Sequence, residues 1–290
     1  MSQECDVGII GLGAMGTPMT HRMLAAGLRV AVTSRRPKND LLTAGAQWFD
    51  SPRELGDQCS TVLLMVPDFP EIEQVCGGPD GVLASEGRFL LMIGATVDAS
   101  ETGAFATRVE QLSNGRIGVV DCPVSGGTEG ASTGQLSIML GGTVEHTTTA
   151  SRVLRPCGEP VRVGPIGAGQ VAKACNQLVV ASTMMAIGEA SVLAARSGID
   201  LGALWDLLGH GYAGSALLEV KRDRIVNDDY APGGAAKYMS KDLESAAGVA
   251  AATNTTTVLL GPLADAYAKL VARGYGDDDL AVTKRFIESG

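Results

Sequence analysis

The sequence predicts an α/β protein, with an N-terminal doubly wound sheet over residues 1–164 and an all-helical C-terminal domain over residues 165–290. Two observations support this fold class. Short apolar segments alternate with helical stretches through the first half of the chain, and no convincing strand pattern follows residue 164. Alternation of strands and helices is typical of a doubly wound domain, and a chain of 290 residues is long enough for two domains.

The candidate strands of the first half are short and almost continuously apolar. This pattern is typical of strands that are buried on both faces of a mainly parallel sheet. We therefore expect helices on both faces of one sheet. The candidate strands are Val7–Ile10, Val30–Thr33, Thr61–Val66, Phe89–Ile93, Gly118–Asp121, Ser137–Leu140 and Val161–Val163.

Two of the intervening helices carry start signals. Ser51-Pro52-Arg53-Glu54 has the spacing of a capping box, in which a Ser side chain accepts a hydrogen bond from the backbone N–H three residues later. Proline at the first helical position supports the same start, because the N–H that it lacks has no helical partner there. Asp98-Ala99-Ser100-Glu101 has the same spacing, with Asp as the cap.

A long helix, from Gln170 to about Arg196, is expected to open the second domain. Alanine and serine surround its apolar stripe, so the helix is apolar nearly all round, which is typical of a buried helix. We place the domain boundary near Pro165, so that this helix is an interdomain helix. Glycine and proline separate the further helices at Gly198, Gly209–Gly214, Pro232–Gly234 and Gly261-Pro262.

The composition excludes several classes of partner. Hydrophobic residues make up 45% of the chain, charged residues 19%, and the net charge is −9. No stripe of Lys or Arg is present, so nucleic acid is not an expected partner. The first residues run directly into a strand, which leaves no room for a signal peptide, and no apolar stretch approaches the ~18 residues of a membrane span. We therefore expect a cytoplasmic protein without membrane contact.

The six cysteines lack the spacing of a metal site. No two form a CxxC pair, and no histidine lies near them at zinc-ligand spacing. Most fall in apolar segments, so we expect buried, reduced thiols in the cytosol and no bound metal.

Gly11-Leu12-Gly13-Ala14-Met15-Gly16 is a G-x-G-x-x-G motif between the strand Val7–Ile10 and a helical pattern. In this strand–turn–helix setting the motif predicts a Rossmann-type dinucleotide site. Gly11 permits the tight turn, Gly13 lets the backbone approach a pyrophosphate, and Gly16 lets the helix pack on the strand. The helix N-terminus then offers N–H donors to the phosphates. The alternative is a glycine-rich turn without a ligand.

The end of the second strand indicates which dinucleotide is bound. NAD sites place Asp or Glu about twenty residues after the first strand, where the carboxylate holds the ribose 2′-OH. Here the segment Thr33-Ser34-Arg35-Arg36-Pro37 contains no acid. Two guanidiniums and a hydroxyl suit a 2′-phosphate, so we expect NADP(H), with NAD(H) as the weaker cofactor. The alternative is a pair of solvated surface arginines.

Four motifs, in order, resemble those of the β-hydroxyacid dehydrogenase family. That family includes 3-hydroxyisobutyrate dehydrogenase, tartronate semialdehyde (2-hydroxy-3-oxopropionate) reductase and succinic semialdehyde/glyoxylate reductases, and the resemblance covers nearly the whole chain. The first motif is Val7–Met19, around the glycine loop. The others are D-x-P-V-S-G-G at Asp121–Gly127, G-x-G-x-x-x-K-x-x-N-[NQ] at Gly167–Gln177, and K-D-L at Lys241–Leu243.

The resemblance implies hydride transfer between NADP(H) and a small β-hydroxy acid or its semialdehyde. It implies that Lys173 gives a proton to the nascent alkoxide during reduction and takes it back during oxidation. Asn176 and Gln177 would orient the hydroxyl or carbonyl. Their spacing from Lys173 places all three on one face of the long helix. Without the resemblance, Lys173 could instead be a lysine whose ammonium reaches the surface.

The substrate carboxylate is expected at Ser125, Gly126 and Gly127. These residues follow a strand at its carboxyl end, where ligands bind in open α/β sheets, and their N–H groups and hydroxyl can hold an anion. Without the resemblance, this segment is also compatible with a plain turn.

The resemblance places further residues near the cofactor. Thr96 would lie by the nicotinamide, and Lys241 would point toward the cofactor and substrate. Without the resemblance, we would expect Lys241 and Asp242 to form an exposed pair at the surface. We also expect Met65, Val66 and Pro67, at the end of the third candidate strand, to line the cofactor site.

Two segments depart from the family pattern. Relatives have D-x-S-[ST] where this chain has Ile93-Gly94-Ala95-Thr96, so that only Thr96 matches. Many relatives also have Phe seven residues before the K-D-L lysine, where this chain has Gly234, and Tyr238 replaces an aliphatic residue. These changes leave open which hydroxy acid is the substrate.

Two rival functions use the same fold. An imine reductase generally lacks the catalytic lysine, so Lys173 argues against it. A regulatory protein that binds NADP(H) without turnover needs neither Lys173 nor the Ser125 segment. We also expect a homodimer or homotetramer, because the nearly all-apolar long helix exceeds what one small domain covers.

Overall fold

The computed structural model describes residues 5–290, and its internal contacts divide the chain into two units. The first unit extends to Lys173 and the second begins at Ala174, so the division falls within helix α8 (Ala168–Arg196). The domain boundary that the sequence suggests at residues 164/165 stays a prediction.

The first unit is built on a nine-stranded, mostly parallel sheet. Its order is β3-β2-β1-β4-β5-β6-β8-β7, with β9 paired to β8. All neighbouring pairs from β3 to β6 are parallel, β8 runs antiparallel to β6 and β7, and β9 runs parallel to β8. The strands are β1 (Val7–Ile10), β2 (Val30–Thr33), β3 (Gln47–Trp48), β4 (Thr61–Leu64), β5 (Phe89–Ile93), β6 (Ile117–Asp121), β7 (Val124–Ser125), β8 (Leu136–Gly141) and β9 (Gly158–Gly164).

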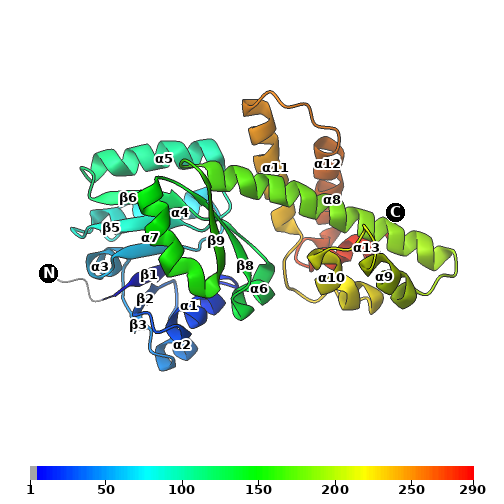
Figure 1. Ribbon diagram of the computed structural model, residues 1–290, viewed down its shortest axis with the longest axis horizontal. Helices are drawn as coiled ribbons and strands as arrows, with labels where there is room; N and C mark the ends of the chain where they lie inside the picture. The colour runs from blue at the N-terminus through cyan, green and yellow to red at the C-terminus, as the bar shows by residue number, and fades with distance from the viewer. Residues whose placement is uncertain (1–4) are drawn as a thin grey trace. The chain divides into compact units, whose positions relative to one another are not determined.

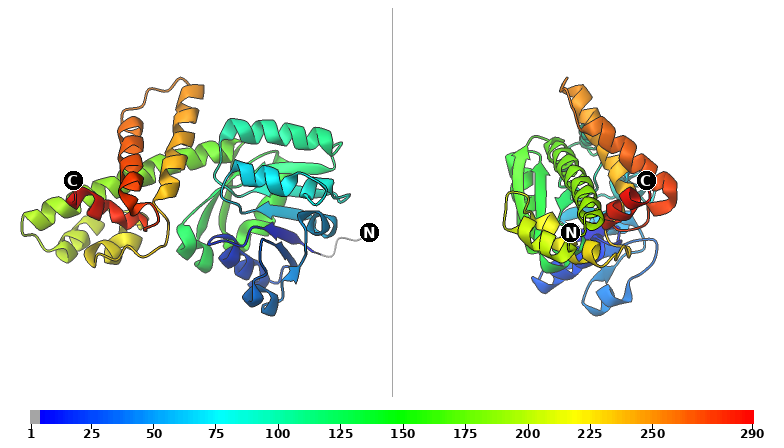
Figure 2. Two further views of the ribbon diagram at one scale, coloured as in Figure 1. Left: turned by 180° about the vertical axis from the view of Figure 1, so that it is seen from behind. Right: turned by 90° about the vertical axis from the view of Figure 1, so that its right-hand side faces the viewer.

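Helices cover both faces of this sheet, which confirms the doubly wound prediction. One core lies under α1, α2, α6 and α7 and includes Ile9, Val32 and Met92 from the strands. The other lies under α3, α4 and α5 and includes Ile10 and Leu64. Figure 1 shows α7 in front of the sheet, and Figure 2 shows the opposite side. These helices are α1 (Gly16–Ala25), α2 (Asn39–Thr43), α3 (Pro52–Gln58), α4 (Phe69–Cys76), α5 (Ala99–Leu112), α6 (Gly127–Thr133) and α7 (Val144–Leu154), with short 3₁₀ segments at Val82–Ala84 and Arg155–Cys157.

Both predicted helix starts are present. The Ser51 side chain accepts a hydrogen bond from the N–H of Glu54 (3.2 Å) at the start of α3. The Asp98 side chain accepts from the N–H groups of Ser100 (2.7 Å) and Glu101 (3.1 Å) at the start of α5. Each cap satisfies N–H groups that have no partner within the helix.

The second unit is helical and has its own apolar core. This core includes Trp205, Tyr267 and Leu243, and the Tyr267 hydroxyl donates to the carbonyl of Ala181 on α8 (3.3 Å). Helices α11 and α12 run side by side (Figure 1). The elements are α9 (Leu201–Gly209), α10 (Ala216–Val226), α11 (Lys237–Ala252), α12 (Leu260–Leu270) and α13 (Thr283–Glu288), with a π-helical segment at Val271–Tyr275 and a 3₁₀ segment at Leu280–Val282.

Helix α8 corrects two sequence-based expectations. It is long and apolar enough to cross a membrane by length and composition, whereas we expected no stretch of that kind; the core helix of a soluble protein passes the same test. It is also less buried than its composition suggests. Only 44% of its most apolar stretch is buried, and Val179 and Leu193 are 64% and 68% exposed. The even spread of Ala and Ser leaves no sequence signal for the side that is exposed.

Five of the six cysteines are buried as expected, and Cys175 on α8 is exposed. Burial raises the pKa of the Cys76 and Cys157 thiols to about 12, which keeps these thiols protonated and unreactive at neutral pH. Among residues 5–290, no group of three or more His, Cys, Asp and Glu side chains is arranged to hold a metal ion.

Candidate active site

The glycine loop has the geometry of a dinucleotide cradle. Gly11 has a φ of +102°, and a Cβ there would lie 2.5 Å from the carbonyl oxygen of Met65. A Cβ on Gly16 would lie 2.0 Å from the carbonyl oxygen of Gly11, so α1 starts too close to β1 for any side chain. A Cβ on Gly13, in contrast, would meet no atom of the described chain within 4 Å. Gly11 and Gly16 thus close the turn, while Gly13 leaves its backbone open to a pyrophosphate.

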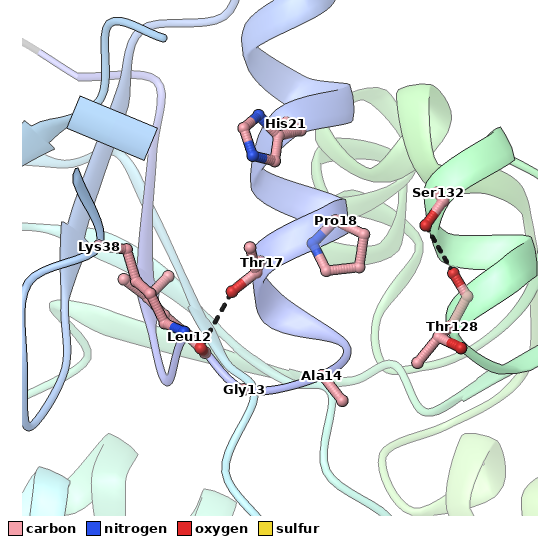
Figure 3. Close-up of a pocket in the computed structure, with 9 residues that line it drawn as sticks. All are labelled: Leu12, Gly13, Ala14, Thr17, Pro18, His21, Lys38, Thr128 and Ser132. Atoms are coloured by element: carbon pink, nitrogen blue, oxygen red, sulfur yellow. Dashed lines mark hydrogen bonds between the residues drawn. The ribbon is translucent and has the colours of Figure 1, made fainter. Parts of the chain in front are cut away.

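The start of α1 remains open beside this loop. The N-cap residue, Met15, makes no side-chain hydrogen bond within the described residues, and the Thr17 hydroxyl donates back to the carbonyl of Leu12 (3.0 Å). A depression of about 450 Å³ borders the loop (Figure 3). It is lined by Leu12, Gly13, Ala14, Thr17, Pro18, His21, Lys38, Thr128 and Ser132. These features fit a bound dinucleotide, whose phosphates the helix N-terminus would favour.

The end of β2 carries the residues predicted to bind the 2′-phosphate on the ribose of NADP(H). Arg35 and Arg36 are both exposed, and the Ser34 hydroxyl donates to the carbonyl of Arg36 (2.7 Å). Arg35 also forms an ion pair with Glu71, in the first turn of α4. The Asp68 side chain caps that turn by accepting from the N–H of Glu71 (3.0 Å). Glu71 therefore ties Arg35 to α4, a contact that the local sequence did not indicate.

The remaining predicted site residues of the first unit share one edge of the sheet. β1, β4, β5 and β6 are consecutive parallel neighbours, so their carboxyl ends meet at the same edge. The segments that follow these ends are the glycine loop, Met65–Pro67, Gly94–Thr96 and Cys122–Gly127. Parallel pairing therefore brings together residues that lie far apart in the sequence, at the edge where open α/β sheets bind ligands.

Asp121, at the end of β6, anchors the start of α8. Its Oδ1 accepts from the N–H of Gly167 (2.7 Å) and its Oδ2 from the N–H of Gln170 (2.8 Å). Asp121 is fully buried; burial raises its pKa above the ordinary value, and the N–H donors offset part of that rise. The carboxylate thus takes the place of a helix cap, and it fixes the first turn of α8 to the edge of the sheet.

The two glycines of the third motif make this close approach possible. Gly167 has a φ of +88°, in the left-handed region that glycine adopts without strain. A Cβ on Gly169 would lie 2.3 Å from the carbonyl oxygen of Met139 and 2.6 Å from Oδ2 of Asp121. One turn beyond Gly169, Lys173 is only 7% exposed, so a charged group is held in a largely enclosed position.

Two predicted site residues of the second unit, Asn176 and Gln177, form a hydrogen-bonded chain with Asp242. Nδ2 of Asn176 donates to Oε1 of Gln177 (2.9 Å), and Nε2 of Gln177 donates to Oδ2 of Asp242 (2.5 Å). The Lys241 ammonium lies 3.6 Å from the other oxygen of Asp242. Asp242 is 6% exposed, so the expectation of an exposed pair is wrong for this residue. Asp242 instead fixes the orientation of the Gln177 amide.

The residues that depart from the family pattern lie in different surroundings. Ile93, where relatives have Asp, is fully buried at the end of β5, and Ala95, where relatives have Ser, is 4% exposed. Gly234 donates its N–H to Asp279 (3.0 Å), and a Cβ there would meet no described atom within 4 Å. Tyr238 is 49% exposed.

Comparison with known proteins assigns the family. Residues 6–175 match the family model for the NAD binding domain of 6-phosphogluconate dehydrogenase, and residues 167–286 match the model for the NAD-binding region of NADP-dependent 3-hydroxyisobutyrate dehydrogenase. The chain is 35% identical to a probable 3-hydroxyisobutyrate dehydrogenase-like protein of Arabidopsis thaliana, over 92% of this chain and 85% of that one. It is 34% identical to the 2-hydroxy-3-oxopropionate reductase of Escherichia coli, over 83% of this chain and 82% of that one.

The chain belongs to the β-hydroxyacid dehydrogenase family. It is therefore an oxidoreductase that uses a nicotinamide dinucleotide and acts on a hydroxy acid. The crystal structure of 3-hydroxyisobutyrate dehydrogenase from Salmonella typhimurium superposes with a TM-score of 0.87 at 28% identity, covering 97% of this chain and 99% of that one. The Rossmann-type unit and the helical unit of this β-hydroxyacid dehydrogenase are thus as the sequence predicts.

Three residues of this β-hydroxyacid dehydrogenase support the predicted site, although the sequence assigned them no role: Asp242 and Glu71 contact predicted site residues, and Asp121 holds the turn before Lys173. Asp121 and Asp242 stand inside motifs of the family, so their positions were a signal, although their partners were not. Glu71 lies in no motif, and only the folding of α4 beside β2 reveals its contact with Arg35.

Proposed function

We propose that this protein transfers hydride reversibly between NADP(H) and a small β-hydroxy acid or its semialdehyde. Substrates of the 3-hydroxyisobutyrate, tartronate semialdehyde, succinic semialdehyde or glyoxylate type fit this proposal. The observation that carries it is the attachment of α8 to Asp121. The carboxylate holds the turn before Lys173 at the sheet edge from which Ser125, Gly126 and Gly127 follow.

Each predicted site residue has a defined task in this reaction. The bound nicotinamide supplies or accepts the hydride. Ser125, with the N–H groups of Gly126 and Gly127, binds the substrate carboxylate, because a hydroxyl and successive N–H groups favour an anion. Lys173 donates a proton to the substrate oxygen during reduction and accepts it during oxidation. Asn176 and Gln177 orient that oxygen, and Asp242 restricts Gln177 to one orientation.

The preference for NADP(H) is supported by charge at the end of β2. Arg35 and Arg36 are exposed cations, and the Ser34 hydroxyl lies beside them. Guanidiniums bind phosphate through paired N–H donors, which a neutral ribose hydroxyl cannot match. The acidic residue of an NAD site is absent from residues 33–37. Lys241 is a further cofactor ligand in this proposal.

A homodimer or homotetramer in the cytoplasm is part of the same proposal. Val179 and Leu193 expose apolar surface on α8, and a second copy of the chain would remove that surface from water. Light scattering should give at least twice the mass of one chain at micromolar concentration. A single-chain mass would exclude this assembly.

An activity panel tests the proposed reaction. Oxidation of NADPH, and separately of NADH, is followed with C3 and C4 semialdehydes, glyoxylate, a neutral aldehyde and a cyclic imine. Turnover of a carboxylated carbonyl with NADPH supports the proposal. Turnover of the imine alone would indicate an imine reductase, and tight NADPH binding without any turnover would indicate a regulatory protein.

A further inference from the structure

We propose that Gln170 is a positioning residue, which holds the segment carrying Thr96 at a fixed distance from the helical turn carrying Lys173. This inference rests on the proposed function, because it assigns Thr96 to the nicotinamide side of the site and Lys173 to the proton transfer. It concerns a residue that bonds the backbone on both sides of Thr96, lies one helical turn before Lys173 and need not touch the substrate.

The hydrogen bonds of Gln170 connect two separate parts of the sheet edge. Its Nε2 donates to the carbonyl of Ala95 (2.8 Å), and its Oε1 accepts from the N–H of Val97 (3.1 Å). Ala95 and Val97 flank Thr96 directly. The side-chain amide therefore pairs with the backbone on both sides of Thr96, as a neighbouring strand would.

The backbone of Gln170 is fixed as well. Its N–H donates to Oδ2 of Asp121 (2.8 Å), which in turn belongs to the end of β6. Gln170 is 1% exposed, so water does not compete for these bonds. Buried hydrogen bonds that are fully paired restrict a structure to one arrangement, since losing a partner leaves a polar group unsatisfied.

Helix geometry transmits this restriction to Lys173. Gln170 and Lys173 are three residues apart in α8, so they lie about one turn apart on the same side of the helix. The stretch from Ala95 to Val97 cannot move relative to Lys173 without breaking the amide pair. A fixed separation matters because a shift of about 1 Å between reacting groups can cost as much as ~10²-fold in rate.

The residue type suits this task closely. A glutamine amide carries a donor and an acceptor on one planar group. The carbonyl of Ala95 needs the donor, and the N–H of Val97 needs the acceptor. Methionine has a similar length and neither hydrogen-bonding group. Ala95 also stands where relatives have a hydroxyl, so its own side chain offers no alternative hydrogen bond.

The test compares Gln170→Met with a control that loses a buried hydrogen bond elsewhere. Thr61→Val serves as the control, because Thr61 is 1% exposed and donates to the carbonyl of Asp6 (2.8 Å) at the opposite end of β4. Four quantities are measured for each protein: Tm, the Kd for NADPH, the steady-state constants with the best carbonyl of the panel, and the deuterium isotope effect with 4-deuterated NADPH. Hydrogen exchange of the Val97 amide is measured without cofactor.

Gln170→Met should lower kcat at least ~10-fold, a fraction of the loss that misplaced reacting groups can cause. Its KM and the Kd for NADPH should stay within about threefold of wild type, its isotope effect should rise, and exchange at Val97 should accelerate. Thr61→Val should lower Tm and keep kcat within about twofold. This contrast separates positioning from a general loss of stability.

A second variant covers the case in which Gln170→Met does not fold. Gln170→Glu keeps the acceptor for Val97 and can donate to Ala95 only when its carboxyl is protonated. Its kcat, relative to wild type, should therefore recover as the pH is lowered.

Two results would overturn the proposal. The first is a kcat within twofold of wild type in folded Gln170→Met. The second is unchanged exchange at Val97. If wild type reduces no carbonyl of the panel while exchange at Val97 still depends on Gln170, the proposed function and the positioning role both fail, and only the structural link remains.

Discussion

The backbone N–H of Gly167 donates to the carboxylate of Asp121 at 2.7 Å, and this contact joins the second and third family motifs. One motif carries Ser125 and the other carries Lys173. A single buried side chain therefore fixes the turn that precedes the proposed proton donor.

Asp121→Asn should lower both stability and kcat. The Asn amide keeps one acceptor but turns an NH₂ group toward an N–H donor, so one of the two bonds is lost. Loss of one hydrogen bond to a charged acceptor costs about 1.5–3 kcal/mol. Denaturant unfolding and steady-state assays on the same preparation measure the two effects. Wild-type values for both would show that the carboxylate is dispensable.

Lys173→Ala should lower kcat by at least ~10²-fold, at the low end of what general acid–base catalysis contributes. The alkoxide formed on carbonyl reduction then has no positioned donor, while NADPH binding persists because the glycine loop is intact. Fluorescence titration with NADPH and turnover assays check the two parts. Lys269→Ala, at an exposed position on α12, is the matched control and should behave as wild type. Loss of NADPH binding in Lys173→Ala would mean that Lys173 is structural.

Ser125→Ala should weaken substrate binding, with KM rising about 5- to 30-fold and kcat changing less. This range corresponds to ~1–2 kcal/mol, at the low end for a hydrogen bond to a charged group, because the N–H groups of Gly126 and Gly127 remain. The measurement is a KM comparison between a carboxylated carbonyl and its neutral analogue. If the neutral analogue is used as efficiently by wild type, the Ser125 segment does not bind a carboxylate.

Replacing Arg35 and Arg36 with neutral residues should raise the KM for NADPH and leave that for NADH nearly unchanged. Glu71→Gln should act in the opposite direction and tighten NADPH binding by up to about fivefold, because the ion pair with Arg35 competes with a 2′-phosphate. The limit is modest because an exposed ion pair is worth only ~0–1 kcal/mol. Equal kcat/KM values for NADPH and NADH in wild type would show that Arg35 and Arg36 do not bind the 2′-phosphate.

The helical unit should lose stability in acid through Asp279. Both oxygens of this buried carboxylate lie 2.7 Å from the Lys221 ammonium. Burial by itself would raise the pKa of Asp279, but Lys221 and the N–H groups of Ala281 and Gly234 bring it below the ordinary value. A lowered folded-state pKa means that the stabilisation is present above about pH 4 and is lost as the pH falls through the folded-state value.

Asp279→Asn should therefore lower the free energy of unfolding at pH 7 by about 3–5 kcal/mol, since it leaves Lys221 without its buried partner. It should also flatten the decline of stability below pH 4. Urea unfolding between pH 3 and pH 7 measures both effects. Asp277→Asn, which removes an exposed partner of Lys237, should leave the pH profile as in wild type. If the free energy of unfolding of Asp279→Asn falls below pH 4 as steeply as that of wild type, other carboxylates cause the loss of stability in acid.

The sequence by itself determined the layered architecture and the family. All seven predicted strands are present, and near-continuous apolarity correctly marks those that are buried on both faces. β9 is the exception, because Val161 and Val163 are 52% and 47% exposed on a strand that pairs with β8 alone. The glycine loop was equally predictable, since the absence of a Cβ at Gly11 and Gly16 is a strict steric requirement. The motif around Lys173 suggested the proposed proton transfer only through its resemblance to the family.

Only the tertiary structure decided which groups hold those residues in place. β3 and β7, two residues each, are too short to produce a periodic signal, and they exist because a longer neighbour pairs with them. The sequence did not indicate which side of α8 is exposed, because apolar and small residues are spread evenly around the helix. The contacts of Asp121 with Gly167, of Gln170 with Ala95 and of Arg35 with Glu71 join residues that are distant in the sequence. Such contacts depend on parallel strands ending at one edge of the sheet, so they follow from the packing of the whole unit and from no local pattern.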